Sequence, residues 1–73
     1  MNEKEIIQWA IKGIEADLKN HNKRLRLDIQ LMNKNDRDTL FVEKVKKRIA
    51  DRREEIELLS RKKAFLVVLL EEK

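Results

Sequence analysis

Few side chains in this sequence could do covalent chemistry. Ser60, Thr39 and His21 are the only serine, threonine and histidine among the 73 residues, and cysteine and tyrosine are absent. A nucleophilic site would need Ser60 or Thr39 within hydrogen-bonding reach of His21. In the helical hairpin predicted below, His21 lies about nine residues, or roughly 13 Å, from Ser60 along the helix axis. We therefore predict that the chain has no catalytic site and is not an enzyme.

Metal and cofactor sites also lack their usual residues. A single histidine and no cysteine exclude a Cys/His metal site, and Gly13 is the only glycine, so no glycine-rich loop can cradle a phosphate. Acidic residues gather at Glu54, Glu55 and Glu57, but basic residues flank them. That pattern is typical of a solvated helix face with ion pairs four residues apart. We expect no metal, no cofactor and no small-molecule substrate.

The basic residues give the best indication of a binding function. Lys19 to Arg26 holds four Lys or Arg residues and no acid, and the facing part of the second predicted helix adds six more, with Glu43 and Asp51 opposing them. We predict a basic belt around the loop-proximal half of the hairpin. It could contact an acidic protein surface or the phosphates of nucleic acid, and no aromatic residue is interleaved for base stacking. The candidate contact residues of the belt are Lys19, Lys23, Arg24, Arg26, Lys44, Lys46, Lys47, Arg48 and Arg53.

The segment that must position most of the belt runs from Thr39 to Leu70 without proline or glycine. Nine residues within it recur at alternating steps of three and four, which places them on one stripe of a helix, as in a coiled coil. Seven of the nine are apolar, so the stripe is narrow and needs a partner. These residues are Val42, Val45, Ile49, Arg52, Ile56, Leu59, Lys63, Leu66 and Leu70.

The first half of the chain predicts a second long helix. Asn2 and Glu5 have the spacing of an N-cap and its reciprocal acid, so the helix is expected to begin at about Glu3. Its stripe has one extra step of four, from Leu18 to Asn22, which resembles a stutter that unwinds a supercoil locally. The predicted stripe is Ile7, Ile11, Ile14, Leu18, Asn22, Leu25, Ile29 and Met32.

The connection between the helices is predicted at residues 33–38, a polar segment rich in Asn and Asp. Six residues suit a turn between antiparallel neighbours. The predicted fold is an all-α antiparallel two-helix hairpin, with one domain over 1–73: a helix at 3–32, the loop, and a helix at 39–71. Folding there brings a polar level of the first helix, His21 and Asn22, opposite Asp51 and Arg52.

Each helix also carries a second apolar stripe, and a hairpin can bury only one stripe per helix. A chain below about 80 residues rarely builds a sufficient core alone, and there are no disulfides to help. A second copy is the simplest source of further helices, so we predict a homodimer that forms a four-helix bundle. The candidate interface residues are Ile6, Trp9, Gly13, Ala16, Leu27, Leu31, Leu58, Phe65 and Leu69.

The apolar end, Ile6 to Ile11 with Ala64 to Leu70, allows other readings. It could fill the groove of a different protein or lie on a membrane surface, although Glu71 and Glu72 follow it where a membrane helix favours basic residues. Its longest apolar run has seven residues, against about 20 for a membrane span. With no signal-peptide pattern, we expect a soluble cytoplasmic chain.

From these patterns the expected function is that of a non-enzymatic interaction protein, such as a regulator, an inhibitor or an assembly factor. RNA or DNA binding through the basic belt is the alternative, and a purely structural oligomer is a third reading. Salt-dependent binding to nucleic acid, compared with capture of a protein partner, separates the first two.

Overall fold

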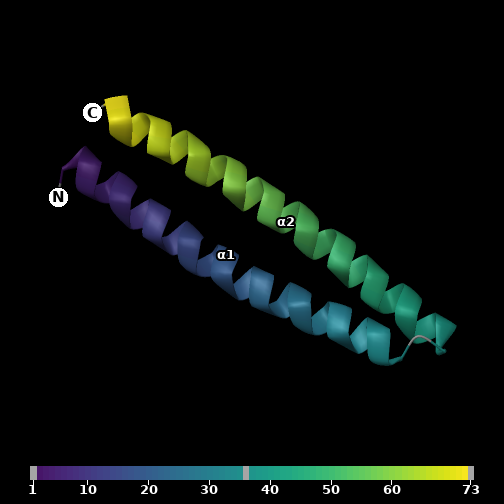
Figure 1. The fold of residues 1–73 in the computed structure, drawn as a ribbon. Coiled ribbons are helices and arrows are strands. Elements are labelled where there is room, and N and C mark those ends of the chain that lie inside the picture. The colour runs from purple at the N-terminus through teal and green to yellow at the C-terminus, as the bar shows by residue number, and fades with distance from the viewer. Residues whose placement is uncertain (1, 36, 73) are drawn as a thin grey trace.

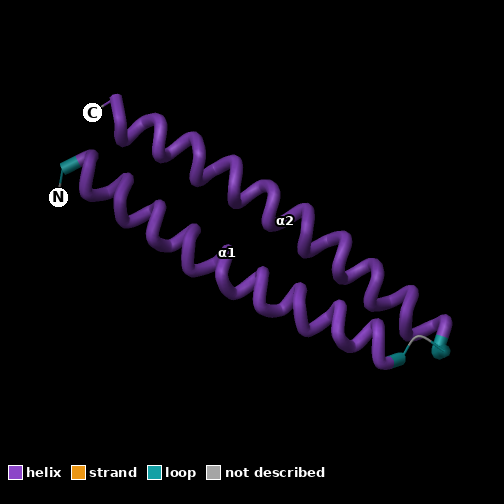
Figure 2. The backbone as a smooth tube through the Cα atoms, in the orientation of Figure 1, coloured by secondary structure: helices purple, strands orange, loops and turns teal. Residues whose placement is uncertain are grey.

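The computed structural model describes residues 2–35 and 37–72, which form two long antiparallel helices (Figure 1). Helix α1 spans Glu3–Lys34 and α2 spans Thr39–Glu72. A short connection reverses the chain, so that the N-terminal end of α1 and the C-terminal end of α2 lie together, away from the connection (Figure 2). The Cα atoms extend over 54 × 14 × 13 Å. The prediction of an all-α helical hairpin is confirmed, and the described residues contain no strand.

Side chains close the N-terminal ends of both helices. The Asn2 Oδ1 atom accepts a hydrogen bond of 2.9 Å from the Glu5 backbone N–H. The Asp38 Oδ1 atom accepts one of 3.2 Å from the Phe41 N–H. Each bond satisfies a donor that has no partner within its own helix, which stabilises the end by about 1 kcal/mol.

The C-terminal end of α1 lies two residues beyond the predicted one, at Lys34 instead of residue 32. Neither Asn33 nor Lys34 prevents helical backbone geometry, since both retain the N–H group that proline lacks. The helix ends where Asn35 satisfies its last carbonyls. The Asn35 backbone N–H donates to the Leu31 and Met32 oxygens, and its side-chain amide donates to the Leu31 oxygen at 2.9 Å.

The inner stripe of α2 packs against α1 along its whole length. All nine residues of the predicted stripe are buried or half-buried, and Val45 and Ile49 are the most enclosed, at 1% and 6% exposure. The alternation of three and four residues therefore continues through Arg52 and Lys63. The long stems of these basic residues can pack against apolar neighbours while their charged ends reach polar groups or water.

The inner stripe of α1 differs from the predicted one. Asn22 is exposed, whereas His21 is half-buried and Asp28 is buried. The predicted stutter is therefore wrong, because the inner residues alternate by four and three without interruption. The predicted stripe follows Asn22 and Ile29, whereas the observed stripe continues through His21 and Asp28, one residue earlier in each case. The observed inner residues are Ile7, Ile11, Ile14, Leu18, His21, Leu25, Asp28 and Met32.

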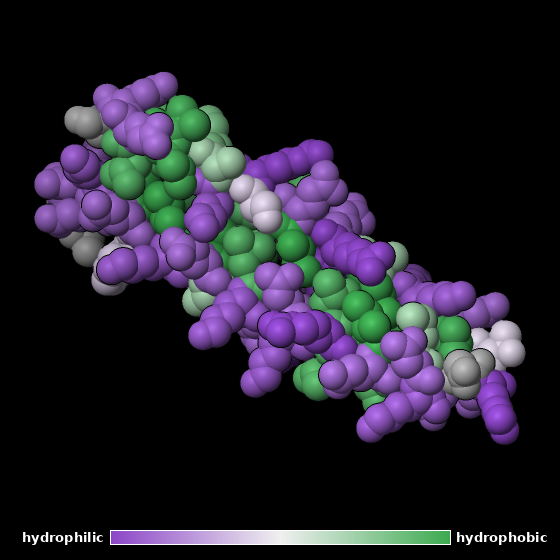
Figure 3. Space-filling model, in the orientation of Figure 1, coloured by the Kyte–Doolittle hydropathy of each residue, from purple (hydrophilic) through white to green (hydrophobic). Residues whose placement is uncertain are grey.

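Little of the chain is fully buried. Among the described residues, only Ile11, Asp28, Val45 and Ile49 are buried, and the total accessible surface is 6069 Å². Apolar side chains run along the visible side of the molecule between polar ones (Figure 3). In residues 2–35 and 37–72, no helix combines the length and apolar character that crossing a membrane requires.

Candidate interaction surfaces

A partly buried charged cluster joins the two helices in the loop-proximal half. This Asp28 cluster consists of His21 and Asp28 from α1 with Arg48 and Arg52 from α2. Arg48 Nη2 donates to Asp28 Oδ1 at 2.6 Å, and Arg52 Nη1 donates to His21 Nδ1 at 2.9 Å. A guanidinium group has no acceptor, so Arg52 is the donor and the Nδ1 lone pair of His21 is the acceptor. The cluster thus joins two levels of the hairpin, seven residues apart on α1.

The electrostatic balance of the cluster depends on Asp28. Its side chain is 4% exposed, that of Arg52 is 18% exposed, and that of Arg48 is 58% exposed. Arg52 Nε lies 3.8 Å from Asp28 Oδ2, within ion-pair range but too far for a hydrogen bond, and both atoms are buried without another partner. Two cations thus share one buried carboxylate. Removing that carboxylate would cost more than the pair's net contribution to folding, since Arg52 would remain enclosed and unpaired.

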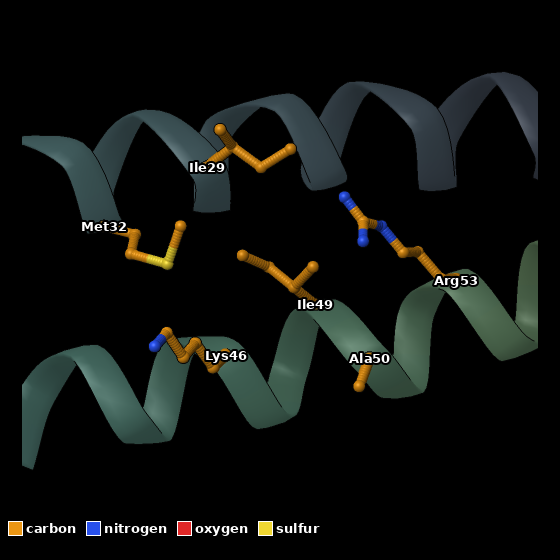
Figure 4. Close-up of a pocket in the computed structure, with 6 residues that line it drawn as sticks. All are labelled: Ile29, Met32, Lys46, Ile49, Ala50 and Arg53. Carbon is orange, nitrogen blue, oxygen red and sulfur yellow. The ribbon is translucent and has the colours of Figure 1, made fainter.

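Two shallow grooves lie on opposite sides of the helix pair and define its two faces. One groove, of about 300 Å³, is lined by Arg24, Leu27, Asp28, Leu31, Arg48 and Arg52. The other, of about 280 Å³, is lined by Ile29, Met32, Lys46, Ile49, Ala50 and Arg53. In Figure 4, Met32 and Ile49 of the second groove point toward each other, while Arg53 extends from α2 toward α1. Because the inner residues follow a seven-residue repeat, other positions can be assigned to either side.

The side with Leu27 and Leu31 carries most of the exposed apolar residues, and we call it the apolar face. Exposure there is 50% for Leu27, 41% for Leu31, 47% for Leu58 and 64% for Phe65. Of the predicted interface residues, seven lie on this face, while Trp9 and Ala16 lie on the adjoining outer edge of α1. The apolar face comprises Ile6, Ala10, Gly13, Leu27, Leu31, Phe41, Leu58, Phe65 and Leu69.

The side with Lys46 and Arg53 is polar. Its loop-proximal half carries four basic residues and one acid, Glu43, and we call that half the basic face; the terminal half of the same side carries Glu5, Glu15, Glu57 and Glu71. Arg26 and Lys19 lie on the same side of α1, three and ten residues before Ile29. All nine belt residues are exposed, but they divide among three sides of the hairpin. Lys19, Arg26, Lys46 and Arg53 lie on the basic face. Lys23 and Lys47 lie on the outer edges of the helices. Arg24, Lys44 and Arg48 lie on the side of the apolar face.

The three residues considered for nucleophilic chemistry do not come together in a site of their own. His21 is bonded to Arg52, while Ser60 and Thr39 are exposed on α2, twenty-one residues apart. Among residues 2–35 and 37–72, no group of three His, Asp or Glu side chains is arranged to hold a metal ion. The features that remain to be explained are surfaces: the apolar face, the basic face and the charged cluster between the helices.

No protein-family model matches this chain, and comparisons with curated proteins and with solved structures found no match. The function must therefore be argued from the surfaces themselves.

Asp28 is the residue that sequence reasoning missed. A signal for it is present in the sequence, because Leu18, His21, Leu25 and Asp28 continue the four-and-three alternation begun at Ile7. A buried acid is normally paired, and the basic segment of the second helix opposite this stripe can supply the cation. The predicted stripe contains the neighbouring apolar residue Ile29 in place of Asp28, and Ile29 is half-buried beside the observed stripe.

Proposed function

We propose that the chain is a non-enzymatic helical interaction protein. Two copies pair through their apolar faces into a four-helix bundle, and the bundle presents its basic faces to an acidic surface of a protein partner. In this role the protein acts as a regulator, an inhibitor or an assembly factor, through contacts and not through chemistry.

The observation that carries the proposal is the large surface of the single hairpin. A compact protein of 8.8 kDa exposes about 4,800 Å² by the usual scaling of surface with mass. This hairpin exposes 6069 Å², an excess of about 1,300 Å² over that expectation. A standard protein interface buries about 800 Å² per partner, and homodimers often bury more. The excess is therefore of the size that a second copy would cover, and the apolar face is where such burial gains the most.

The basic face supports the second part of the proposal. It lies on the opposite side of the helix pair from the apolar face, so a dimer formed through the apolar faces leaves both basic faces exposed. Its groove is lined by the apolar residues Ile29, Met32, Ile49 and Ala50 together with Lys46 and Arg53, and Met32 and Ile49 point toward each other between the helices (Figure 4). An acidic, partly apolar helix of a partner protein would match that combination in charge and in surface chemistry.

Sedimentation and light scattering from 1 to 100 μM test the assembly. We expect a dimer that dissociates on dilution, with a red shift of the Trp9 emission, since Trp9 borders the interface and is 70% exposed in the single hairpin. Phe65→Glu should weaken the dimer by at least tenfold. Leu40→Glu is the matched control, because Leu40 is 67% exposed but lies on the outer edge of α2. A folded monomer at every concentration would refute the assembly.

Crosslinking in extracts of the native host, followed by mass spectrometry, tests the partner. The bait is the dimer, and the control is Lys46→Glu with Arg53→Glu, which reverses two charges on the basic face. We expect an acidic protein that crosslinks to the dimer and is lost with the control variant. Confirmation then requires the purified partner to bind the dimer. A purified partner that binds both versions equally would refute a role for the basic face.

Nucleic-acid binding is a second candidate, favoured by the exposure of all nine belt cations. If it occurs, log K falls with log salt by about 0.9 per phosphate contact on duplex DNA, so four contacts cost roughly 100-fold between 50 and 200 mM salt. Anisotropy titrations with random RNA and duplex DNA measure this slope. A protein partner would show a shallower dependence on salt, because apolar contacts persist when charges are screened. Absence of binding at 50 mM salt would eliminate this candidate.

A further inference from the structure

The charge of the hairpin is divided unevenly along its length. Residues 19–55, which form the loop-proximal half, hold twelve basic and seven acidic residues, a net charge of +5. Residues 1–18 and 56–73 form the terminal half, with six basic and seven acidic residues and a net charge of −1. A pair of hairpins with their loops at the same end would bring the two +5 halves together. A pair with loops at opposite ends brings each +5 half next to a −1 half.

The same division is present on the apolar face. Its seven-residue repeat places Arg24, Lys34, Lys44 and Arg48 in the loop-proximal half, with Asp51 and Glu55. The repeat places Glu3, Asp17 and Glu72 in the terminal half, with Lys62. The face thus has a net charge of +2 in one half and −2 in the other. A surface that is self-complementary in this way fits a second copy that lies antiparallel to the first, with its loop at the opposite end.

The geometry of a two-fold pair decides which helices meet. When two hairpins pack face to face with their loops at opposite ends, α1 lies over α1 of the other copy and α2 over α2. When the loops lie at the same end, α1 lies over α2 of the other copy. The two arrangements therefore bring different residues into contact.

The antiparallel arrangement, with the loops at opposite ends, gives compatible contacts along α1. The helix spans Glu3–Lys34, so its centre lies near Lys19. Lys34 of one copy then lies at the level of Glu3 of the other, and Leu31 lies at the level of Ile6. Leu27 meets Ala10, and the small residues Ala10 and Gly13 permit close approach of the helices.

The arrangement with loops together gives poorer contacts. The hydrogen bond between Arg48 and Asp28 sets the levels of the two helices. With α1 over the second copy's α2, Leu27 would lie near the level of Arg48, Leu31 near Lys44 and Lys34 near Phe41. Arg24 would lie near Asp51, which is the one pair of opposite charges in this arrangement. At the terminal end, Glu3 would meet Glu72. Like charges at the terminal end, and apolar residues beside cations in the loop-proximal half, disfavour this pairing.

We infer that the second copy packs on the apolar face antiparallel to the first, with the two loops at opposite ends of the bundle. This inference rests on the proposed dimer and specifies its partner surface and orientation. It also gives the bundle two equivalent basic regions, one at each end, separated by roughly the length of half a helix, about 24 Å.

Distances between spin labels test the orientation. A label on Asn33→Cys lies near the loop on the side of the basic face, and a control label on Lys19→Cys lies near the centre of α1 on that side. In an antiparallel dimer the two Asn33 labels are about 29 residues apart along the helix direction and a bundle width apart across it, so we expect about 50 Å. The Lys19 labels should be about 25 Å apart in either orientation, since only the width of the bundle separates them.

The outcomes separate the orientation from the dimer itself. A long distance at position 33 with a short one at position 19 supports the inference. Short distances at both positions overturn the antiparallel orientation and leave the dimer standing. No intermolecular distance at either position, with a monomer in sedimentation, overturns the proposed dimer and the inference with it.

Reversing the charge of Lys34 provides an independent test, because the two arrangements predict changes of the dimer Kd in opposite directions. In the antiparallel dimer, Lys34→Glu places an acid at the level of Glu3 twice per dimer, and we expect the Kd to rise roughly tenfold. With the loops together, the nearest charged residue on the facing surface is Lys44 of the other copy, so the same change removes a repulsion and the Kd would fall. Lys46→Glu on the basic face is the control and should leave the Kd within about twofold. A Kd lowered by Lys34→Glu overturns the orientation.

Discussion

The loop-proximal half of the hairpin is better buried than the terminal half, although the terminal half is the more apolar in sequence. Asp28, Val45 and Ile49 are buried near the loop, whereas Ile11 is the only buried residue described near the termini. The terminal half nevertheless contains the seven-residue apolar run from Ala64 to Leu70. Two packed helices have one inner stripe each, so apolar residues on any other stripe stay exposed however many there are. Burial in this molecule therefore follows helix pairing and not local hydrophobicity.

The difference implies that the two halves are stabilised by different contacts. The loop-proximal half has an internal charged cluster and two enclosed aliphatic residues. The terminal half exposes Phe65 and Val68, and in the proposed dimer it would depend more on the second copy. Variants in the first half should then change the stability of each hairpin, and variants in the second should change the affinity between copies.

Asp28→Ala should have the largest effect. It leaves two arginines without their buried carboxylate, and removing one partner of a buried ion pair typically costs 3–5 kcal/mol. Because Arg48 is 58% exposed and water can solvate it, we expect the lower end, about 3 kcal/mol. The free energy of unfolding from denaturant titrations at fixed protein concentration measures it. Glu15→Ala, at an exposed position, should stay within about 0.5 kcal/mol. Equal losses from both variants would show that the cluster has no special role.

Val45→Ala tests the comparison with a matched pair of valines. Val45 is 1% exposed in the loop-proximal half, and Val68 is 51% exposed in the terminal half. Deleting two buried methyl groups and leaving a small cavity should cost about 2 kcal/mol at Val45. Val68→Ala should change the free energy of unfolding by about 0.5 kcal/mol or less. A larger loss at Val68 would mean that the outer edge of α2 is also covered in the assembled protein.

Arg52→Leu should cost about 1 kcal/mol, because Arg48 still pairs with Asp28 while His21 loses a hydrogen bond. Without knowledge of Asp28, an apolar replacement of an inner arginine would be expected to be neutral or stabilising. That expectation should hold for the double variant Asp28→Leu with Arg52→Leu, which removes the buried charges together. We expect the double variant to be more stable than Asp28→Ala in the same titration. A double variant that loses the sum of both single losses would show that the residues act independently.

The sequence predicted the two helices of this fold better than it predicted which polar residues on them are buried. The inner stripe of α2 follows directly from the spacing between Val42 and Leu70, because seven of its nine residues are apolar and neither Arg52 nor Lys63 breaks the step. In α1 the stripe passes through His21 and Asp28, whereas the extra step of four from Leu18 predicts the exposed Asn22 instead. Whether a buried acid is tolerated depends on cations from the other helix, and this requires the register between the helices.

The candidate surfaces show a similar limit. Sequence spacing places Leu27 and Phe65 on outer stripes of two helices, but it does not show that both stripes lie on the same side of the pair. The two grooves supply that information, because each is lined from both helices. The belt likewise reads as one basic region in the sequence. In the structure it is divided, and the hairpin separates Arg24 from Arg26, which lie only two residues apart.

Gly13→Ala should have the smallest effect, and its sign depends on the second copy. Gly13 is exposed in the hairpin, and a Cβ atom added there meets nothing within 4 Å. On helix propensity alone, alanine should therefore stabilise α1 by about 0.5–1 kcal/mol. In the antiparallel dimer, however, Gly13 of one α1 lies at the level of Arg24 of the other α1. A methyl group added at Gly13 would hold the two helices apart. We expect the thermal stability to rise at low micromolar concentration, where the hairpins are separate. We expect the Kd of the dimer to rise by about threefold to tenfold. Sedimentation of Gly13→Ala beside Lys12→Ala, which changes the neighbouring residue on the other side of α1, measures the second effect. If Gly13→Ala tightened the dimer as much as it stabilised the helix, the second copy could not lie over this part of α1.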